Sequence, residues 1–533
     1  MRAHALVALF VVAAAVAGPR SVLAARDRPD IVVVLADDMG MSDLGCGGGE
    51  IRTTNLDRLA ANGLRFTRFY NSDKCSPTRA ALLTGVRDVV SLEAIRIRPE
   101  CATAAEILAD AGYATAMVGK WHLALKGDLT QSPTRRGFQR FYGTILGATS
   151  YWAPASLRFN EENATADCEE PDFYYTDAIT QNAVWMIEAT PAEQPLFLYV
   201  AYTAPHWPLH AWPEDVERYR GRYAEGWDAL REERFARMRE LGVIPADAEL
   251  SPRDPEVPAW EDAPDQEWEQ RRMEVYAAQI DRMDQGIGRI VSALEAAGRL
   301  DDTLFLFLSD NGACAVEYED DREGHYLPDS TRDGRPMRPG NVPGLMPGPE
   351  DTFQSYGRGW ANASATPFRL FKEYAHEGGV LTPLIVHWPA GLRSEPGAVI
   401  DQVGQVIDLL PTFLDVAGVE IPAELNGREL IPPDGTSLLP VLEGGARPQF
   451  PPVVWNYAHG AGIREGDWKL VQAERTGGWW TPADVWRALR GERRGSWELY
   501  DLAEDPTELR DLAKEQPERA ARLKARWREL ALR

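Results

Sequence analysis

Five short apolar segments, rich in β-branched residues, constrain the fold of this chain more than any other feature of its sequence. They occupy residues 31–36, 113–119, 195–202, 303–309 and 382–388. Nearly unbroken apolar strands of this length are typical of parallel sheets that are covered on both faces. Helical patterns over 103–112 and 273–298 each precede one of these segments. The alternation predicts an α/β fold, with a mostly parallel sheet sandwiched by helices.

Polar side chains follow four of these five segments directly. They are Asp37 and Asp38, Asp310 and Asn311, Lys120 and His122, and His206. Any one of them alone is compatible with an ordinary polar loop. Ligands of parallel sheets bind beyond the carboxyl ends of the strands, so the fold would bring these loops to one edge. The Asp and Asn side chains offer only oxygen ligands, which suit Ca²⁺ or Mg²⁺ better than zinc.

The segment CSPTRAALLTG, residues 75–85, has the pattern of a helix with a reactive start. Pro77 suits the first turn of a helix, and Gly85 is a natural stop. Cys75 would then lie at the helix N-terminus, where backbone N–H groups and the helix dipole favour negative charge. Arg79, one turn later, can reach the same place. The local pattern leaves open an ordinary helix start or a nucleophile beside its anion clamp.

The formal net charge of −24 restricts the partners of the chain. A nucleic-acid-binding protein would normally present a basic face, so no nucleic acid is expected. An anionic substrate would also be repelled by the protein as a whole, and any anion site must be a local basic pocket. Arg79, Lys120, His122 and His206 would supply such a pocket.

The first residues, 1–24, read as a signal peptide for export, with an early Arg2, an apolar run and small residues before the cleavage site. A membrane anchor is the alternative. No later stretch is apolar and long enough to span a bilayer, so we expect a periplasmic or secreted protein. The five cysteines are an odd number for an exported chain. The sequence leaves open which of the others form disulfides: Cys46, Cys101, Cys168 and Cys314.

Six motifs in order resemble the type I, formylglycine-dependent sulfatases, and most closely the bacterial arylsulfatases. They are PDIVVVLADDMGMSDLGCGGG, CSPTRAALLTG, GKWHLA, APHWPLHA, LSDNG and FKEYAHEGG. Near the end of the chain, WELYDLAEDPTELRDLA is similar to the C-terminal signature of that family. The resemblance covers nearly the whole chain after the predicted signal peptide. Its C-x-P-x-R core is highly specific.

The resemblance implies an alkaline-phosphatase-like catalytic domain over residues 25–440 and a smaller C-terminal α+β domain over 441–533. Within the second, the segment VVWNYAHGAGIREGDWKLVQAE predicts two strands joined around Gly462 and Gly466. A closing helix is expected from Pro517 to Leu532. Together they would form a small antiparallel sheet with one helix packed on it.

The resemblance also implies a modified nucleophile and a bound cation. In the family, a separate formylglycine-generating enzyme oxidises the cysteine of C-x-P-x-R to 3-oxoalanine, which would explain the odd cysteine count here. Hydration of that aldehyde gives a diol that can attack sulfur with one oxygen and expel sulfate with the other. Ca²⁺, or Mg²⁺ in its place, would be held by Asp37, Asp38, Asp310 and Asn311, with the Cys75-derived oxygen completing the shell.

The family pattern assigns the remaining roles as follows. Arg79 orients the formylglycine, and Lys120 and Lys372 bind sulfate oxygens and offset charge in the transition state. His122 would hydrogen-bond the diol and assist its collapse. His206, together with Lys372, would protonate the leaving oxygen. Without the resemblance, Lys372 would pass as a surface lysine.

The expected activity is the hydrolysis of aryl or related sulfate esters, including small-molecule or glycan sulfates. One alternative keeps the site and takes phosphoesters or phosphonates, because sulfate and phosphate share tetrahedral geometry. A second alternative is a catalytically silent binding protein. The chain departs from the family at 84–100, at Ala124 and at Ala313. None of these departures removes a catalytic position, but the first puts substrate preference in doubt.

Overall fold

The structure is a computed structural model that describes residues 28–87, 96–125, 127–318, 326–447, 450–457, 460–472 and 495–532. The predicted signal peptide, residues 1–24, lies outside the described residues. In the described part of the chain, no helix is both long and apolar enough to cross a membrane.

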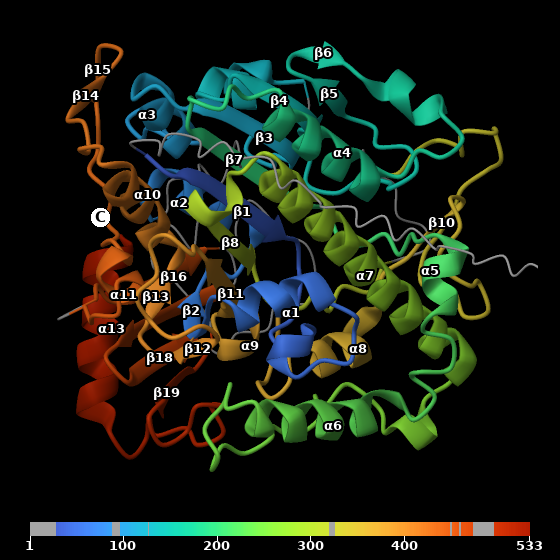
Figure 1. Ribbon diagram of the computed structural model, residues 1–533. Helices are drawn as coiled ribbons and strands as arrows, with labels where there is room; N and C mark the ends of the chain where they lie inside the picture. Colours follow the sequence, from blue (N-terminus) through green and yellow to red (C-terminus); the bar gives the residue numbers. More distant parts are fainter. Residues whose placement is uncertain are drawn as a thin grey trace, which may run out of the picture.

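The centre of the protein is a large mixed sheet (Figure 1). Its strands are β1 Asp30–Ala36, β2 Leu64–Tyr70, β3 Ala114–Lys120, β4 Arg140–Thr144, β5 Leu157–Phe159, β6 Glu162–Asn163, β7 Leu196–Ala201, β8 Thr303–Ser309, β11 Leu381–His387, β12 Ala398–Ile400 and β13 Gly404–Gln405. The order is β12-β2-β11-β8-β1-β7-β3-β4-β5-β6, and β13 also pairs with β2. The strands β8, β1, β7, β3 and β4 are parallel, which confirms the expected mostly parallel sheet.

Helices cover both faces of this sheet (Figure 1). Their bounds are α1 Thr54–Ala61, α2 Cys75–Thr84, α3 Ala104–Asp110, α4 Tyr175–Glu188, α5 Pro213–Glu217, α6 Gly226–Glu240, α7 Gln266–Ala296, α8 Gly357–Ser364, α9 Glu377–Val380, α10 Leu409–Ala417 and α11 Leu439–Leu442. Val32 and Val34 of β1 belong to the core formed with α1, α4 and α7. Ile31 and Val33, which point to the other face, belong to the core formed with α2, α3 and α10. Burial on both faces explains why β1 is apolar without alternation.

The direction of β11 sets it apart from the other four predicted strands. It runs antiparallel to both β8 and β2, and its register pairs Leu381 with Tyr70 of β2. The start of β11 and the end of β2 therefore lie at the edge where the parallel strands have their carboxyl ends. Chain segments that precede β11 and follow β2 meet at that edge.

The C-terminal part of the chain forms a second, smaller sheet covered by a helix (Figure 1). Its strands are β16 Val453–Tyr457, β17 Gly460–Glu465, β18 Trp468–Gln472 and β19 Trp497–Asp501, all antiparallel, and the helix is α13 Pro517–Ala531. The small antiparallel sheet with one helix is as expected, while the boundary at residue 441 stays a prediction. The expectation of two strands over 453–472 was wrong, because the segment forms three. Gly466, at φ 64°, makes a turn, whereas Gly462 lies inside β17.

None of the five cysteines forms a disulfide in this structure. Cys75, Cys101, Cys168 and Cys314 are buried, and Cys46 is partly buried.

Candidate active site

The helix α2 presents Cys75 at its first turn. Pro77 lies in that turn, and Gly85 ends the helix in the left-handed conformation at φ 67°, as the sequence predicted. Lys74 caps the helix in an extended conformation. Every residue of α2 is buried, and only 3% of Cys75 is exposed. The thiol therefore sits at the electropositive end of a helix that is enclosed by the core.

His122 is the side chain in contact with the Cys75 sulfur. It follows β3, and its Nδ1 lies 3.2 Å from Sγ of Cys75. A Cβ on Gly147 would lie only 2.4 Å from Nε2 of His122, so the loop after β4 backs directly onto the ring. Burial, together with the neighbouring charges of Lys120 and Arg79, lowers the pKa of His122 well below its usual value. The imidazole is therefore neutral and can exchange a proton with a group on residue 75.

Arg79 links the nucleophile helix to the loops after β3 and β8. Its Nε and Nη2 donate to Oδ2 of Asp310 at 3.0 and 2.8 Å, and Nη1 donates to the carbonyl of Lys120 at 2.9 Å. A longer contact of 3.6 Å joins Nη2 to Asp37. Although burial opposes it, the carboxylates of Asp310 and Asp37 raise the pKa of Arg79 above its usual range. The guanidinium thus stays charged while fully buried.

The strand register brings four oxygen-bearing side chains together. Ala36 of β1 pairs with Ser309 of β8, so Asp37 and Asp310 leave their strands side by side. Ligand atoms of Asp37, Asp310 and Cys75 all lie within 4.8 Å of one another. Burial first, and then the charge of Asp310, raise the pKa of Asp37 to about 8. A cation bound beside these buried carboxylates would stabilise their ionised forms and so lower the pKa of Asp37.

Three buried oxygens of this cluster accept no hydrogen bond from the described residues: Oδ1 of Asp37, Oδ2 of Asp38 and Oδ1 of Asn311. The amide of Asn311 donates to Oδ1 of Asp38 at 2.7 Å, which turns its own oxygen away. Buried polar atoms without a partner are costly, and carboxylate and amide oxygens are the ligands that Ca²⁺ and Mg²⁺ prefer. The residues present therefore fit a hard divalent cation.

Two lysines contact the acidic cluster, each through a different aspartate. Nζ of Lys120 donates to Oδ2 of Asp37 at 2.5 Å, and Nζ of Lys372 donates to Oδ1 of Asp38 at 2.5 Å. Although burial opposes it, Asp38 raises the pKa of Lys372 well above its usual value. Lys372, which the sequence pattern alone would have placed on the surface, is 8% exposed and belongs to the site.

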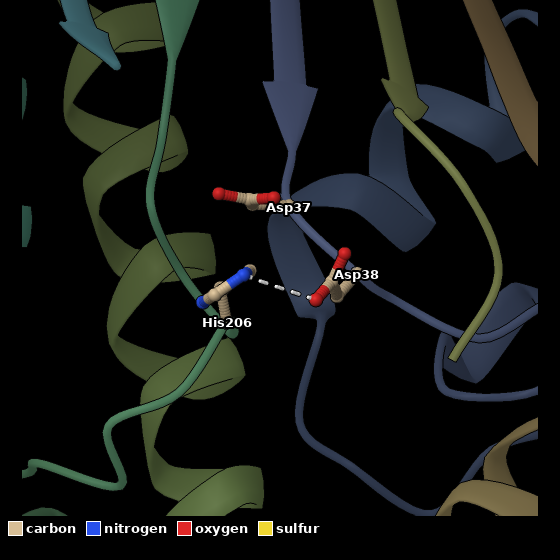
Figure 2. Close-up of side chains that lie close together, drawn as sticks. All are labelled: Asp37, Asp38 and His206. Atoms are coloured by element: carbon tan, nitrogen blue, oxygen red, sulfur yellow. Dashed lines mark ion pairs between the residues drawn. The ribbon is translucent and has the colours of Figure 1, made fainter. Parts of the chain in front are cut away.

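His206 faces Asp38 from the segment after β7 (Figure 2). Its Nε2 lies 3.3 Å from Oδ2 of Asp38, and its Nδ1 lies 2.6 Å from the carbonyl of Trp207. Only a protonated Nδ1 can donate to a carbonyl, so this bond fixes the tautomer and aims Nε2 at the site. Burial lowers the pKa of His206 well below its usual value, although Asp38 opposes the shift.

The sequence did not single out Tyr151, which supports His206. Its hydroxyl donates to the carbonyls of Thr203 and His206 at 2.9 and 2.8 Å. Tyr151 follows β4, a strand that was missed along with β2. The sequence of β2, LRFTRFY, has an apolar period of two at its start that could have revealed it. Of the two missed strands, β2 is the more important for the site, because the chain runs from its end to Cys75.

Three histidines that the sequence gave little weight, His210, His376 and His387, lie outside this cluster. His210 packs in the core, where its Nδ1 accepts from the N–H of Tyr151 at 3.3 Å and its Nε2 donates to the carbonyl of Thr352 at 2.7 Å. His376 contacts Glu498 at 3.0 Å, and His387 lies at the end of β11, on the far edge of the sheet. His325 and His459 lie outside the described residues.

Comparison with known proteins identifies the family. The family model named Sulfatase matches residues 29–419, well over half of the chain. The chain belongs to the sulfatase family. A second model, the C-terminal region of N-sulphoglucosamine sulphohydrolase, matches residues 368–480. That span includes Lys372 and the first three strands of the small sheet.

Two curated sulfatases are similar over most of their length. An uncharacterized sulfatase of Schizosaccharomyces pombe is 32% identical over 92% of this chain and 91% of its own. The arylsulfatase of Klebsiella aerogenes is 34% identical over 78% of this chain and 92% of its own. The sulfatase is thus similar in sequence to an arylsulfatase, and the resemblance to bacterial arylsulfatases is confirmed at the level of the family.

A solved structure shares the fold. The crystal structure of Ps i-CgsB in complex with k-i-k-neocarrahexaose has a TM-score of 0.65 and 21% identity, and covers 95% of this chain and 93% of that one. At this identity the likeness concerns the fold, which confirms the alkaline-phosphatase-like arrangement with a small C-terminal sheet. The protein is a sulfuric ester hydrolase by family.

Proposed function

We propose that this sulfatase releases inorganic sulfate from aryl or related sulfate esters through a formylglycine made from Cys75, beside a bound Ca²⁺. The observation that carries the proposal is the enclosure of Cys75 between a neutral His122, at 3.2 Å, and the oxygen cluster that contains Asp37 and Asp310. A buried thiol at a helix start, facing both a base and a candidate cation site, suits a nucleophile precursor.

The charges of the site favour an anionic substrate once a cation is present. Three cationic side chains of the site each form an ion pair with one carboxylate. The pairs are Arg79 with Asp310, Lys120 with Asp37, and Lys372 with Asp38. The described site is therefore close to neutral without an ion. A divalent cation adds two positive charges, which gives the local basic pocket that a net charge of −24 requires of an anion-binding protein.

The cation would be held by Asp37, Asp38, Asp310 and Asn311, three of which, Asp37, Asp38 and Asn311, have an orphaned oxygen that fits it. When bound, it would supply electrostatic stabilisation of negative charge that develops beside residue 75. Ca²⁺ is the better candidate, because the site offers several oxygens from flexible carboxylates and an amide. Mg²⁺, with its stricter octahedral geometry, is the second choice.

The protein's own side chains would handle the protons. His122, neutral and 3.2 Å from the side chain of residue 75, is placed to take a proton from a hydroxyl there. His206 is held by its Nδ1 bond to Trp207 O, and its Nε2 faces the site. In this tautomer Nε2 is an acceptor, so it would deliver a proton to the leaving oxygen only after it has taken one up during the reaction. Lys372 keeps its charge and would stabilise that oxygen as it departs.

The alcohol part of the ester is proposed from similarity. The 34% identity with the Klebsiella aerogenes arylsulfatase over most of both chains supports small aryl sulfates as first substrates. The leading segment, residues 1–24, supports a periplasmic or secreted enzyme. A formylglycine-generating enzyme would modify Cys75 before the chain is fully folded, since the folded chain leaves only 3% of that residue exposed.

The test combines mass spectrometry with paired substrates. Peptides that span residue 75 are analysed from protein made in its own host, and hydrolysis of 4-nitrophenyl sulfate is compared with that of 4-nitrophenyl phosphate. An aldehyde at residue 75 with preference for the sulfate supports the proposal, and Cys75→Ala serves as the inactive control. Preference for the phosphate would move the activity to the phosphoester alternative. An unmodified thiol without hydrolysis would favour the silent binding protein.

A further inference from the structure

The nucleophile and Lys372 come from neighbouring strands at one edge of the central sheet. Cys75 follows β2, Lys372 precedes β11, and the pairing of these strands continues past their ends, where Asn71 N–H donates to the carbonyl of Val380 at 2.9 Å. Beyond that point, the two segments separate into the turn before α2 and the loop 369–376. The backbone N–H of Lys372 donates to the carbonyl of Ala313 at 2.9 Å, and contacts between the two segments add to this bond in setting the position of Lys372 relative to Cys75.

Two such contacts join the segments next to the site. The backbone N–H of Glu373 donates to the carbonyl of Asp73 at 2.8 Å. Nζ of Lys74 donates to Oε1 of Glu373 at 2.5 Å, between side chains that are 20% and 31% exposed. Glu373 is left-handed, at φ 79°, which is unusual for a side chain of this size. Backbone conformations of this kind persist where surrounding contacts hold them.

The location of this ion pair distinguishes it from others on the surface. Lys74 directly precedes Cys75, and Glu373 directly follows Lys372, so the pair joins the chain neighbours of two site residues. Lys372 also reaches Asp38 with its ammonium group, at 2.5 Å. A shift of the loop 369–376 would therefore move a charge of the site relative to the nucleophile. Displacements of about 1 Å can cost about a hundredfold in rate.

We propose that Lys74 and Glu373 are positioning residues that set the distance between residue 75 and the Lys372 ammonium group. The proposal rests on the sulfatase function proposed above. Both would act through their chain neighbours, residue 75 and Lys372, and not on the ester directly. Because partly exposed ion pairs contribute little to stability, the pair should matter for turnover far more than for folding.

The far side of the same loop is already fixed. Arg369, before Lys372, donates to the hydroxyl of Tyr500 at 2.9 Å, and His376, after it, contacts Glu498 at 3.0 Å. Both partners belong to β19 of the small sheet. The loop is thus anchored at its two ends to the C-terminal sheet, and the Lys74–Glu373 pair holds its middle to the nucleophile segment.

The test uses Lys74→Met, Glu373→Gln and the charge exchange Lys74→Glu/Glu373→Lys in the full-length chain. Each single variant is expected to lower kcat about 5- to 20-fold on 4-nitrophenyl sulfate, a loss within the range given for misplacement, with KM changed less than twofold. The exchange should recover at least half of the lost kcat, and Tm should stay within about 1 °C of wild type. The matched control is Arg526→Met/Glu529→Gln, an ion pair of 2.6 Å on α13, which should leave kcat unchanged.

Lys74 borders the segment that is modified, so the aldehyde content of residue 75 is measured in every variant and kcat is expressed per modified chain. Unchanged kcat in both single variants would overturn the proposal. So would an exchange variant that recovers nothing, or a loss of kcat that parallels a loss of Tm. Failure of the proposed function gives a different result, because the wild-type protein would then lack the aldehyde or the sulfatase activity.

Discussion

Nε and Nη2 of Arg79 both donate to a single oxygen, Oδ2 of Asp310, at 3.0 and 2.8 Å. Both side chains are fully buried. The forked contact holds α2, one turn after Cys75, against the loop that follows β8. A planar guanidinium is the side chain that can do this while donating a third bond to the carbonyl of Lys120.

Arg79→Lys is expected to reduce kcat by about a hundredfold or more, since an ammonium group cannot reproduce the fork and the nucleophile loses its alignment. The stability should also fall, by about 3 kcal/mol, because a buried carboxylate loses its partner. Arg299→Lys is the matched control: Arg299 donates to both oxygens of Asp30, at 3.1 and 3.0 Å, at the opposite end of β1. It should lower Tm comparably and leave kcat per folded chain intact. Equal losses of activity in the two variants would contradict the assignment.

His122→Gln is expected to lower kcat by about 10² to 10⁴, because the side chain next to residue 75 loses its basic nitrogen. The fold should tolerate the change, since glutamine keeps a polar group of similar length. His210→Gln is the control, because His210 is a fully buried histidine that bonds to Thr352 and Tyr151 in the core and lies outside the cluster. Steady-state hydrolysis of 4-nitrophenyl sulfate measures both. Retention of more than a tenth of wild-type kcat in His122→Gln would argue against its role as a base.

Removal of divalent ions is expected to lower Tm and abolish activity, and Ca²⁺ should restore both more effectively than Mg²⁺. A cation at a hundred times its Kd would stabilise the fold by about 2.7 kcal/mol. Asp37→Asn should weaken the response of Tm to added Ca²⁺, because it removes the negative charge of a carboxylate that has an orphaned oxygen. Thermal scans with a chelator, with each ion and with the variant provide the comparison. A Tm that is indifferent to the chelator in the wild type would rule out the proposed site.

The contact of Glu498 with the loop before α9 predicts acid sensitivity. Although burial opposes it, hydrogen bonds and charge from His376 lower the pKa of Glu498 from 4.5 to about 2. The carboxylate therefore stabilises the fold above about pH 4.5, and this contribution is lost as the pH falls toward 2. The Tm difference between wild type and Glu498→Gln should be largest above pH 5 and shrink progressively below pH 4.5. A difference that is constant from pH 7 to pH 3 would refute this linkage.

Much of the central sheet could be predicted because burial on both faces imposes a signature on each strand. The segments 31–36 and 303–309 are apolar throughout, and they lie side by side as β1 and β8. The strand β2 was missed, since its LRFTRFY sequence mixes arginine with aromatic residues near one edge of the sheet. The number of strands between 453 and 472 was also wrong, because Gly462 reads as a turn but is accommodated within β17.

The sequence by itself singled out the polar groups of the candidate site. Asp37, Cys75 and His122 each occupy a position, just past a strand or at a helix start, where local pattern and motif both favour an exposed functional group. Only the tertiary structure decided what these groups contact. The antiparallel direction of β11 brings Lys372 to Asp38, and the loop after β4 presses Gly147 against His122. These contacts join residues that are 334 and 25 positions apart in the chain, and local propensity carries no information about strand direction or loop approach. Packing of the whole chain fixes them.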